Sequence, residues 1–169
     1  MTDELRLQGL RGWLILVGII VVMSPLRSIV EMAWTYPSMF RNDEFVGLIT
    51  AGSEAYQPNL RTVFLSEVIL NLLLLAFSVW VAFLFFSKHY RFPGMFLAMI
   101  GFSLLSHILV TWGYAVAAPW IPVFDPETLR AFFRLIVACL IWTPYMLVSK
   151  RVKLTFVRHR KADYQLVTG

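Results

Sequence analysis

The stretch PETLRAFFRLIVACLIWTPYMLVS, residues 126–149, followed by the basic run KRVKLTFVRHRK, residues 150–161, determines how this chain folds. Its apolar part is long enough to cross the roughly 30 Å hydrocarbon core of a bilayer as a helix, which needs about 20 residues. Two arginines, Arg130 and Arg134, lie near the start of this apolar span. Lys and Arg residues next to a span mark its cytoplasmic side. The stretch therefore predicts a membrane helix that runs inward and carries charge in its outer half.

The composition indicates an integral membrane protein. Of the 169 residues, 59% are hydrophobic and 15% are charged, whereas soluble domains carry about 25% charged residues. Three further apolar runs, each long enough for a membrane helix, precede the one quoted above. Because the ten-residue alternation of a membrane β-barrel is absent, we expect an all-α protein, one domain over residues 1–169 with four transmembrane helices in a bundle. The expected spans are about residues 13–33, 62–86, 92–118 and 126–149, followed by a basic cytoplasmic tail, residues 150–169.

Local signals indicate where helices begin. In the first loop, Asn42-Asp43-Glu44 before an apolar stretch, with Gly52 after it, predicts a short helix on the periplasmic surface. Asp125-Pro126-Glu127 predicts an N-cap, a first-turn proline and an acidic residue at the positive end of the helix dipole. Asn59 is expected to cap the second span.

The basic residues predict the orientation. The formal net charge is +5, and most of the Lys and Arg residues flank spans, which indicates topology and lipid contact instead of nucleic-acid binding. Only Arg41 and Arg61 flank spans on the expected outer side. Both termini are therefore expected in the cytoplasm. The ten basic residues on that side are Arg6, Arg11, Lys88, Arg91, Lys150, Arg151, Lys153, Arg158, Arg160 and Lys161.

Ionisable side chains inside the spans are the candidate ligand-binding residues, because charge in hydrocarbon is costly and marks functional sites by default. Estimated at about 1.5 Å per residue, all of them lie from the middle of the membrane outward. Several stand four residues apart and so share a helix face. We expect a polar cavity that opens outward. Its candidate residues are Arg27, Glu31, Glu67, Asn71, His107, Arg130 and Arg134.

Two interpretations of this cavity remain open. In the structural one, Glu31 neutralises Arg27 and Glu67 neutralises Arg134, so that the charges only fix the register of the helices. In the functional one, three arginines face two glutamates, and the surplus arginine suits a phosphate or carboxylate. For His107, the two interpretations are an interhelical hydrogen bond and a proton relay.

No catalytic motif is present: there is no G-x-S-x-G, no H-E-x-x-H and no phosphate-binding loop. The single cysteine, Cys139, excludes an intrachain disulfide and zinc-type spacing. We therefore expect a protein that is not an enzyme and that holds no cofactor and no metal.

The C-terminal tail alternates basic and apolar residues. One interpretation is an ordinary cytoplasmic anchor, and the sharper one is contact with anionic lipid, at about 1 kcal/mol for each basic residue near the membrane, or with an acidic surface of a partner. The expected lipid contacts are Lys150, Arg151, Lys153, Arg158, Arg160 and Lys161.

Two stretches carry a resemblance. One runs from Gly12 to Gly18 (GWLILVG) and on to Ser24-Pro25-Leu26-Arg27, and the other is IWTPY, residues 141–145, leading to SKRVKLTFV, residues 149–157. Together they resemble the YdgK-like family of small bacterial inner-membrane proteins, which has no established function. The resemblance implies four helices in a bacterial inner membrane, and it supplies no activity and no catalytic residue.

These observations favour two functions. The first is a non-enzymatic accessory or scaffold protein that binds a membrane partner or a lipid. The alternative is a small transporter or lipid-handling protein that uses the outward-facing Arg/Glu/His cavity. Membrane lipids, including anionic phospholipid, and a membrane protein are the expected partners, and nucleic acid is not.

The orientation can be tested with reporter fusions. We expect reporters placed after Lys88 and after Gly169 to report the cytoplasm, and one near Gly52 to report the periplasm, because basic residues flanking spans stay on the cytoplasmic side. A periplasmic signal from the C-terminal reporter would overturn the orientation and the depths estimated from it.

Overall fold

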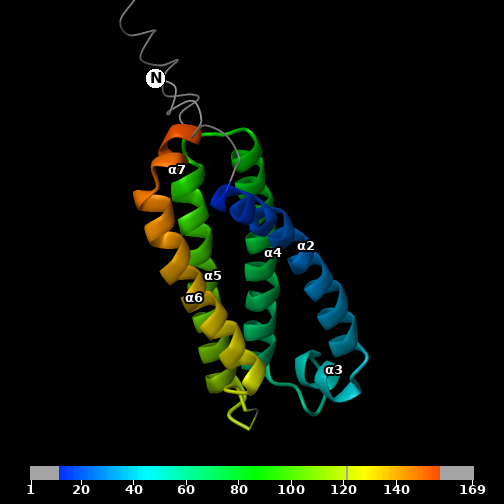
Figure 1. The fold of residues 1–169 in the computed structure, drawn as a ribbon. Coiled ribbons are helices and arrows are strands. Elements are labelled where there is room, and N and C mark those ends of the chain that lie inside the picture. Colours follow the sequence, from blue (N-terminus) through cyan, green and yellow to red (C-terminus); the bar gives the residue numbers. More distant parts are fainter. Residues whose placement is uncertain (1–11, 121, 157–169) are drawn as a thin grey trace, which may run out of the picture.

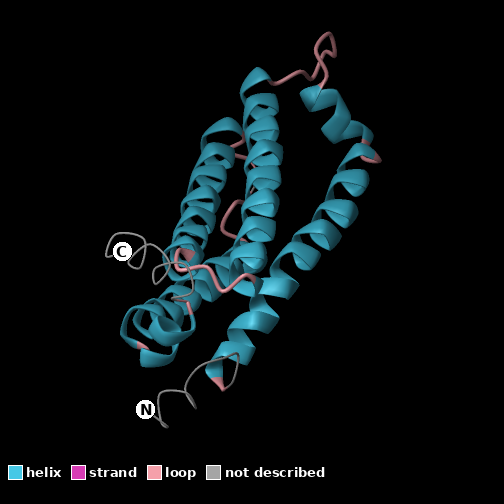
Figure 2. Ribbon diagram, turned by 90° about the horizontal axis from the view of Figure 1, so that it is seen from above, coloured by secondary structure: helices cyan, strands magenta, loops and turns pink. Residues whose placement is uncertain are grey.

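The computed structural model describes residues 12–120 and 122–156, and these residues form helices joined by short connections (Figure 1). Four helices are long and apolar enough to cross a membrane. Among the described residues there is no strand, as Figure 2 also shows, so the expected all-α fold with four long apolar helices is confirmed. The helices are α2 (Trp13–Phe40), α3 (Asp43–Ile49), α4 (Pro58–Phe86), α5 (Phe92–Ala117), α6 (Pro126–Val148) and α7 (Lys150–Thr155).

The four long helices pack in chain order. Helix α2 packs on α4, α4 on α5, and α5 on α6. Helices α2 and α6 therefore form the two outer members of the array, and they diverge toward the end that carries α3 (Figure 1). At the opposite end they approach each other, with 6.5 Å between the ring centroids of Trp13 and Tyr145. We call these the α3 end and the α7 end.

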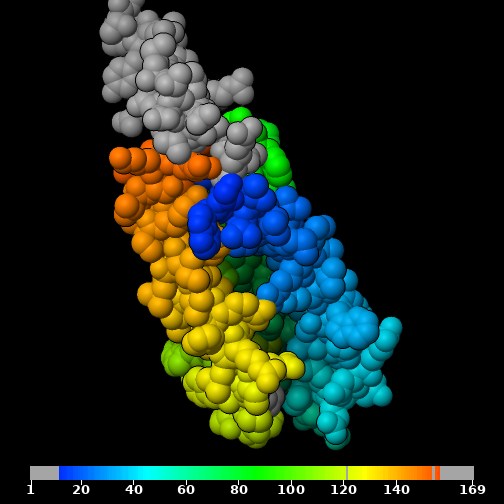
Figure 3. All heavy atoms as spheres, viewed as in Figure 1, coloured from blue at the N-terminus to red at the C-terminus, as the bar shows by residue number. Residues whose placement is uncertain are grey.

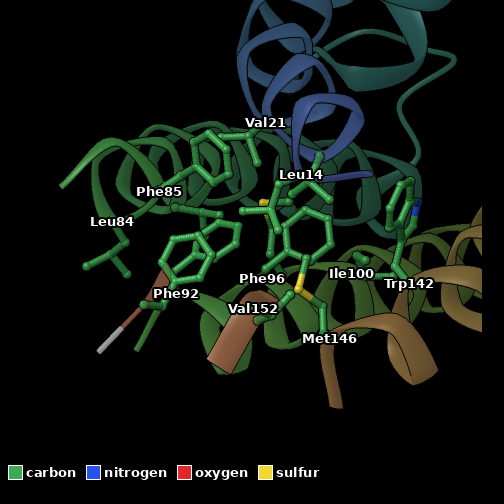
Figure 4. Close-up of a cluster of buried hydrophobic side chains, with 14 residues drawn as sticks. Leu14, Val21, Leu84, Phe85, Phe92, Phe96, Ile100, Trp142, Met146 and Val152 are labelled. Atoms are coloured by element: carbon green, nitrogen blue, oxygen red, sulfur yellow. The ribbon is translucent and has the colours of Figure 1, made fainter. Parts of the chain in front are cut away.

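The buried core lies at the α7 end (Figure 4). The ring of Phe92 stacks on Phe156 at 4.5 Å and meets Phe85 edge-on at 5.0 Å. Each such aromatic pair contributes about 0.5–1.5 kcal/mol beyond the area that it buries. Val152 of α7 is buried in the same cluster. Part of the tail that the sequence assigned to lipid contact therefore packs against the bundle.

Two glycines let α4 approach its neighbours closely. A Cβ added at Gly18 of α2 would lie 3.1 Å from the ring of Phe85 of α4, and one at Gly113 of α5 would lie 3.1 Å from Val63 of α4. Small residues at such positions are typical of helices packed in membranes, where close van der Waals contact drives association.

The expected caps of α3 and α6 are confirmed. The Asn42 side chain accepts hydrogen bonds from the backbone N–H groups of Glu44 and Phe45 at 3.1 and 3.3 Å. The Asp125 side chain accepts one from the Thr128 backbone N–H at 2.7 Å, and this bond holds the pKa of the Asp125 carboxyl below its usual value. The placement of α3 on the periplasmic surface stays a prediction.

Two helix ends differ from the expected ones. Helix α2 continues to Phe40, seven residues beyond the end expected for the first span. Helix α4 begins at Pro58 with Gln57 as its N-cap, so the expectation that Asn59 caps it is wrong. The reason is that Pro58 takes the first helical position, where its fixed φ and missing N–H suit the helix start, and this places Asn59 inside the first turn.

The close contact at Gly113 predicts that a larger side chain there is not tolerated. We expect Gly113→Leu to lower the stability of the detergent-solubilised protein by about 1–3 kcal/mol, because overpacking forces α4 and α5 apart. Gly101→Leu on the same helix is the matched control, since nothing lies within 4 Å of an added Cβ there. Thermal unfolding of both variants measures the difference, and equal midpoints would argue against a tight α4–α5 contact.

Candidate functional site

The surface is hollowed between α2 and α6 toward the α3 end, with α4 and α5 behind the hollow (Figure 3). This follows from the packing order, because α2 and α6 approach only near the α7 end. We call this hollow the α2–α6 groove. From helical geometry we infer that Arg27 and Glu31 lie on its α2 wall and Arg134 on its α6 wall.

Helical geometry shows that these wall residues lie on facing flanks. Trp13 and Tyr145 mark the flanks through which α2 and α6 meet at the α7 end. Glu31 stands eighteen residues after Trp13, which is about five helical turns, and Arg134 stands eleven residues before Tyr145, which is about three turns. Whole numbers of turns return a side chain to the same flank, so Glu31 and Arg134 lie on the flanks of α2 and α6 that border the groove, with Glu31 nearer to the α3 end.

Ring contacts between neighbouring helices set the depth of each residue. Helices α5 and α6 are level where His107 meets Phe132 at 4.6 Å, and α4 and α5 where Phe77 meets Phe102 at 6.3 Å. Helices α2 and α4 are level where Tyr36 meets Phe64 at 6.0 Å. Counting residues along each helix from these contacts gives the level of each charged side chain in the bundle.

Arg134 lies at the level of Arg27, and Glu31 lies about one helical turn nearer to the α3 end. Glu67 lies about two helical turns nearer to the α3 end than Arg134, close to the level of Glu31. The two arginines therefore stand at one depth, and the two carboxyls stand nearer to the α3 end.

The charged wall residues are exposed. Arg27 and Glu31 form an ion pair with 2.6 Å between Nη2 and Oε1, and their side chains are 47% and 57% exposed. Arg130 and Arg134 are exposed as well, and neither forms an ion pair with a described residue. In a helix that crosses a bilayer, such charges are costly until a partner, a headgroup or water neutralises them.

Behind the groove, a carboxylate cluster joins α2, α4 and α5; it consists of Tyr36, Glu67, Asn71 and Tyr114. The Tyr114 hydroxyl donates a hydrogen bond to Oε2 of Glu67 at 2.5 Å. The Asn71 side-chain amide donates one to the Tyr36 hydroxyl at 2.9 Å. No Lys or Arg of the described residues forms an ion pair with Glu67.

His107 belongs to the contact between α5 and α6. Its ring meets Phe132 edge-on and lies beside the backbone of Thr128, close enough to Arg134 to interact electrostatically. Its Nε2 atom is buried without a hydrogen-bond partner. The two interpretations of His107, an interhelical hydrogen bond and a proton relay, stay predictions.

The ion pair that we expected between Glu67 and Arg134 does not form. The two side chains stand about two turns apart along the bundle. Glu67 instead accepts a hydrogen bond from the Tyr114 hydroxyl. The polar residues therefore form two groups, the charged walls of the groove and the carboxylate cluster that joins α2, α4 and α5, and the ligand-binding role expected of them stays a prediction. The Arg27–Glu31 pair of the structural interpretation is present.

Sequence reasoning left two members of the carboxylate cluster out of the candidate site. These are Tyr36 and Tyr114. The available signal was chemical, because a Glu and an Asn inside a span need hydrogen-bond partners and hydroxyl groups on neighbouring helices supply them.

Of the expected lipid contacts in the tail, three lie on α7. The guanidinium of Arg151 lies 3.3 Å from the position of a Cβ at Gly12, so it stands beside the start of α2. Lys150 and Lys153 are exposed. Arg158, Arg160 and Lys161 lie outside the described residues. No three His, Cys, Asp or Glu side chains within residues 12–120 and 122–156 come together to hold a metal ion.

Comparison with known proteins adds a family and no activity. A family model described as "Protein of unknown function (DUF2569)" matches residues 7–157. No curated protein and no solved structure matches the chain.

The hydrogen bond to Glu67 can be tested by removing one hydroxyl. We expect Tyr114→Phe to lower stability by about 1–3 kcal/mol, because the buried carboxylate loses its donor. Tyr145→Phe is the control, since the Tyr145 hydroxyl is buried without a hydrogen-bond partner and its loss should leave stability unchanged or raised. Thermal unfolding in detergent compares the two, and an equal loss in both would show that Tyr114 does not act through Glu67.

Proposed function

The chain belongs to DUF2569, a protein family of unknown function, and from the geometry of its groove we propose that it is a non-enzymatic membrane protein that binds a phospholipid headgroup between α2 and α6. The observation that carries the proposal is the pair of charged walls. Arg134 on one side and Arg27, which is paired with Glu31, on the other stand at one depth, exposed, in helices apolar enough to span a bilayer.

The charge of the walls suits a phosphate. Two arginines and one glutamate leave one positive charge, and a phosphodiester carries one negative charge. The planar guanidinium binds phosphate oxygens through two parallel hydrogen bonds, and it is less strongly hydrated than an ammonium group, so it suits a site that excludes water.

The depth of the walls favours a lipid over a soluble anion. Arg134 is the ninth residue of α6, which places its Cα about 12 Å from the helix start, below the headgroup region of a bilayer whose hydrocarbon core is roughly 30 Å thick. The groove opens sideways between two outer helices (Figure 3). A headgroup that enters from the side leaves its acyl chains outside the groove, where α2 and α6 expose many apolar residues.

The location belongs to the same proposal. The excess of basic residues at one side and the resemblance to YdgK-like proteins support a bacterial inner membrane with both termini in the cytoplasm. The groove then opens to the outer leaflet. The α7 end faces the cytoplasmic leaflet, where Lys150, Arg151 and Lys153 stand near anionic lipid headgroups.

A second candidate is an accessory protein that binds a partner helix. One observation supports it: α2 packs on α4 and leaves much of its apolar surface exposed, including Trp34 and Val30. A partner helix with a carboxylate at the depth of Arg134 would fill the same groove. A transporter has less support, because the buried core closes the bundle at the α7 end.

Lipid retention tests the proposal. We expect native mass spectrometry of the gently solubilised protein to show a retained phospholipid that Arg134→Gln releases. Arg134→Lys should keep the charge and still lose much of the affinity, because a lysine does not reproduce the two-pronged guanidinium contact. Arg41→Gln removes a charge outside the groove and should not change retention.

Two outcomes would contradict the lipid proposal. One is equal lipid retention in the wild type and in Arg134→Gln. The other is a stoichiometric membrane protein, without lipid, that Arg134→Gln releases, which would establish the accessory function instead.

A further inference from the structure

The proposed contact between Arg134 and a phosphate does not involve the carboxylate cluster. Glu67 accepts a single hydrogen bond, from Tyr114, whereas an ionised carboxylate has about four acceptor positions. It is neither fully buried nor fully exposed, and the same holds for Tyr36, Asn71 and Tyr114. The cluster is therefore partly exposed, and the Glu67 carboxylate can accept further hydrogen bonds.

The surroundings of Glu67 favour an ammonium group. Within the described residues its carboxylate forms no ion pair, and a charge held in a membrane helix needs one. The neighbouring side chains that could contact a ligand are aromatic: Tyr114 donates to Glu67, and the Tyr36 ring packs edge-on against Phe64 at 6.0 Å. A carboxylate with aromatic rings beside it binds an ammonium by ion pairing, by N–H donation and by attraction to the ring faces.

Glu67 and the groove walls belong to one ligand-sized region. Glu67 lies about two turns nearer to the α3 end than Arg134. Side chains of a helix lean toward its N-terminus, and both α4 and α6 begin at the α3 end, so the longer Arg134 side chain and the Glu67 side chain lean the same way along the groove. The order along the groove is then apolar surface, arginine and carboxylate, and an amine-bearing phospholipid has the matching order of acyl chain, phosphate and ammonium.

The charges at membrane depth also balance for such a ligand. Arg27 and Arg134 supply two positive charges, and Glu31 and Glu67 supply two negative ones. Arg130 lies in the second turn of α6, near the headgroup region. A headgroup with one phosphate and one ammonium leaves this balance unchanged, whereas an acidic headgroup leaves Glu67 uncompensated.

We propose, on the basis of the phospholipid function inferred above, that the groove is selective for a phospholipid with a primary ammonium headgroup. Arg134 binds the phosphate and Glu67 accepts hydrogen bonds from the ammonium group. A choline headgroup has the same charges and no N–H donor, so the carboxylate stays unsatisfied when choline binds. Sites built to hydrogen-bond a ligand group discriminate strongly against an analogue that lacks it.

The test is a headgroup competition. The purified protein is equilibrated with mixed micelles that contain equal amounts of phosphatidylethanolamine, phosphatidylcholine and phosphatidylglycerol with the same acyl chains, and native mass spectrometry reports the bound lipid. We expect at least about tenfold enrichment of phosphatidylethanolamine in the wild type. Glu67→Gln should abolish the enrichment and still retain lipid through Arg134.

A further variant separates the causes. Arg134→Gln should lower the binding of all three lipids together.

The possible failures are distinguishable. Equal binding of the three lipids by the wild type overturns the ammonium site, and this measurement needs no variant to fold. Undiminished enrichment in Glu67→Gln overturns it as well. Undiminished total lipid in Arg134→Gln overturns the phospholipid function itself.

Discussion

The aromatic cluster at the α7 end packs the helices together where α2 and α6 approach each other. Phe85 of α4 and Phe92 of α5 meet there, and the Phe156 ring that follows α7 lies 4.5 Å from the ring of Phe92. Between membrane helices there is no hydrophobic driving force, because lipid chains are as apolar as side chains, so close packing has to supply the stability. Gly18 makes this packing possible by letting α2 approach Phe85.

The other half of the bundle follows from this constraint. Once α2 and α6 have met at Trp13 and Tyr145, they diverge, and the hollow between them exposes the interior faces of the array (Figures 1 and 3). Polar side chains occupy these faces in two ways. Those on directly packed helices form hydrogen bonds with one another, as Tyr114 does with Glu67. Arg134 faces the groove, where no described helix is close enough to pair with it.

This division distinguishes a structural polar group from a functional candidate. A hydrogen bond between packed helices, such as that from Asn71 to Tyr36, stabilises the fold and needs no ligand. An exposed arginine in a membrane helix places a charge in hydrocarbon, and the fold does not offset the free energy that this costs. Such residues are therefore candidates for binding sites. The buried core at the α7 end packs α2, α4, α5 and α6 together there.

The sequence by itself determined the four apolar helices, the caps at Asn42 and Asp125, and which half of each helix carries polar residues, because these properties depend on residues within a few turns of each other. Only the tertiary structure decided which polar groups meet. Charge alone predicts an ion pair between Glu67 and Arg134. In the bundle, Glu67 accepts a hydrogen bond from Tyr114. The reason is that the relative height of two helices is set by side-chain contacts such as Gly113 against Val63, and the length and polarity of a span carry no information about that height.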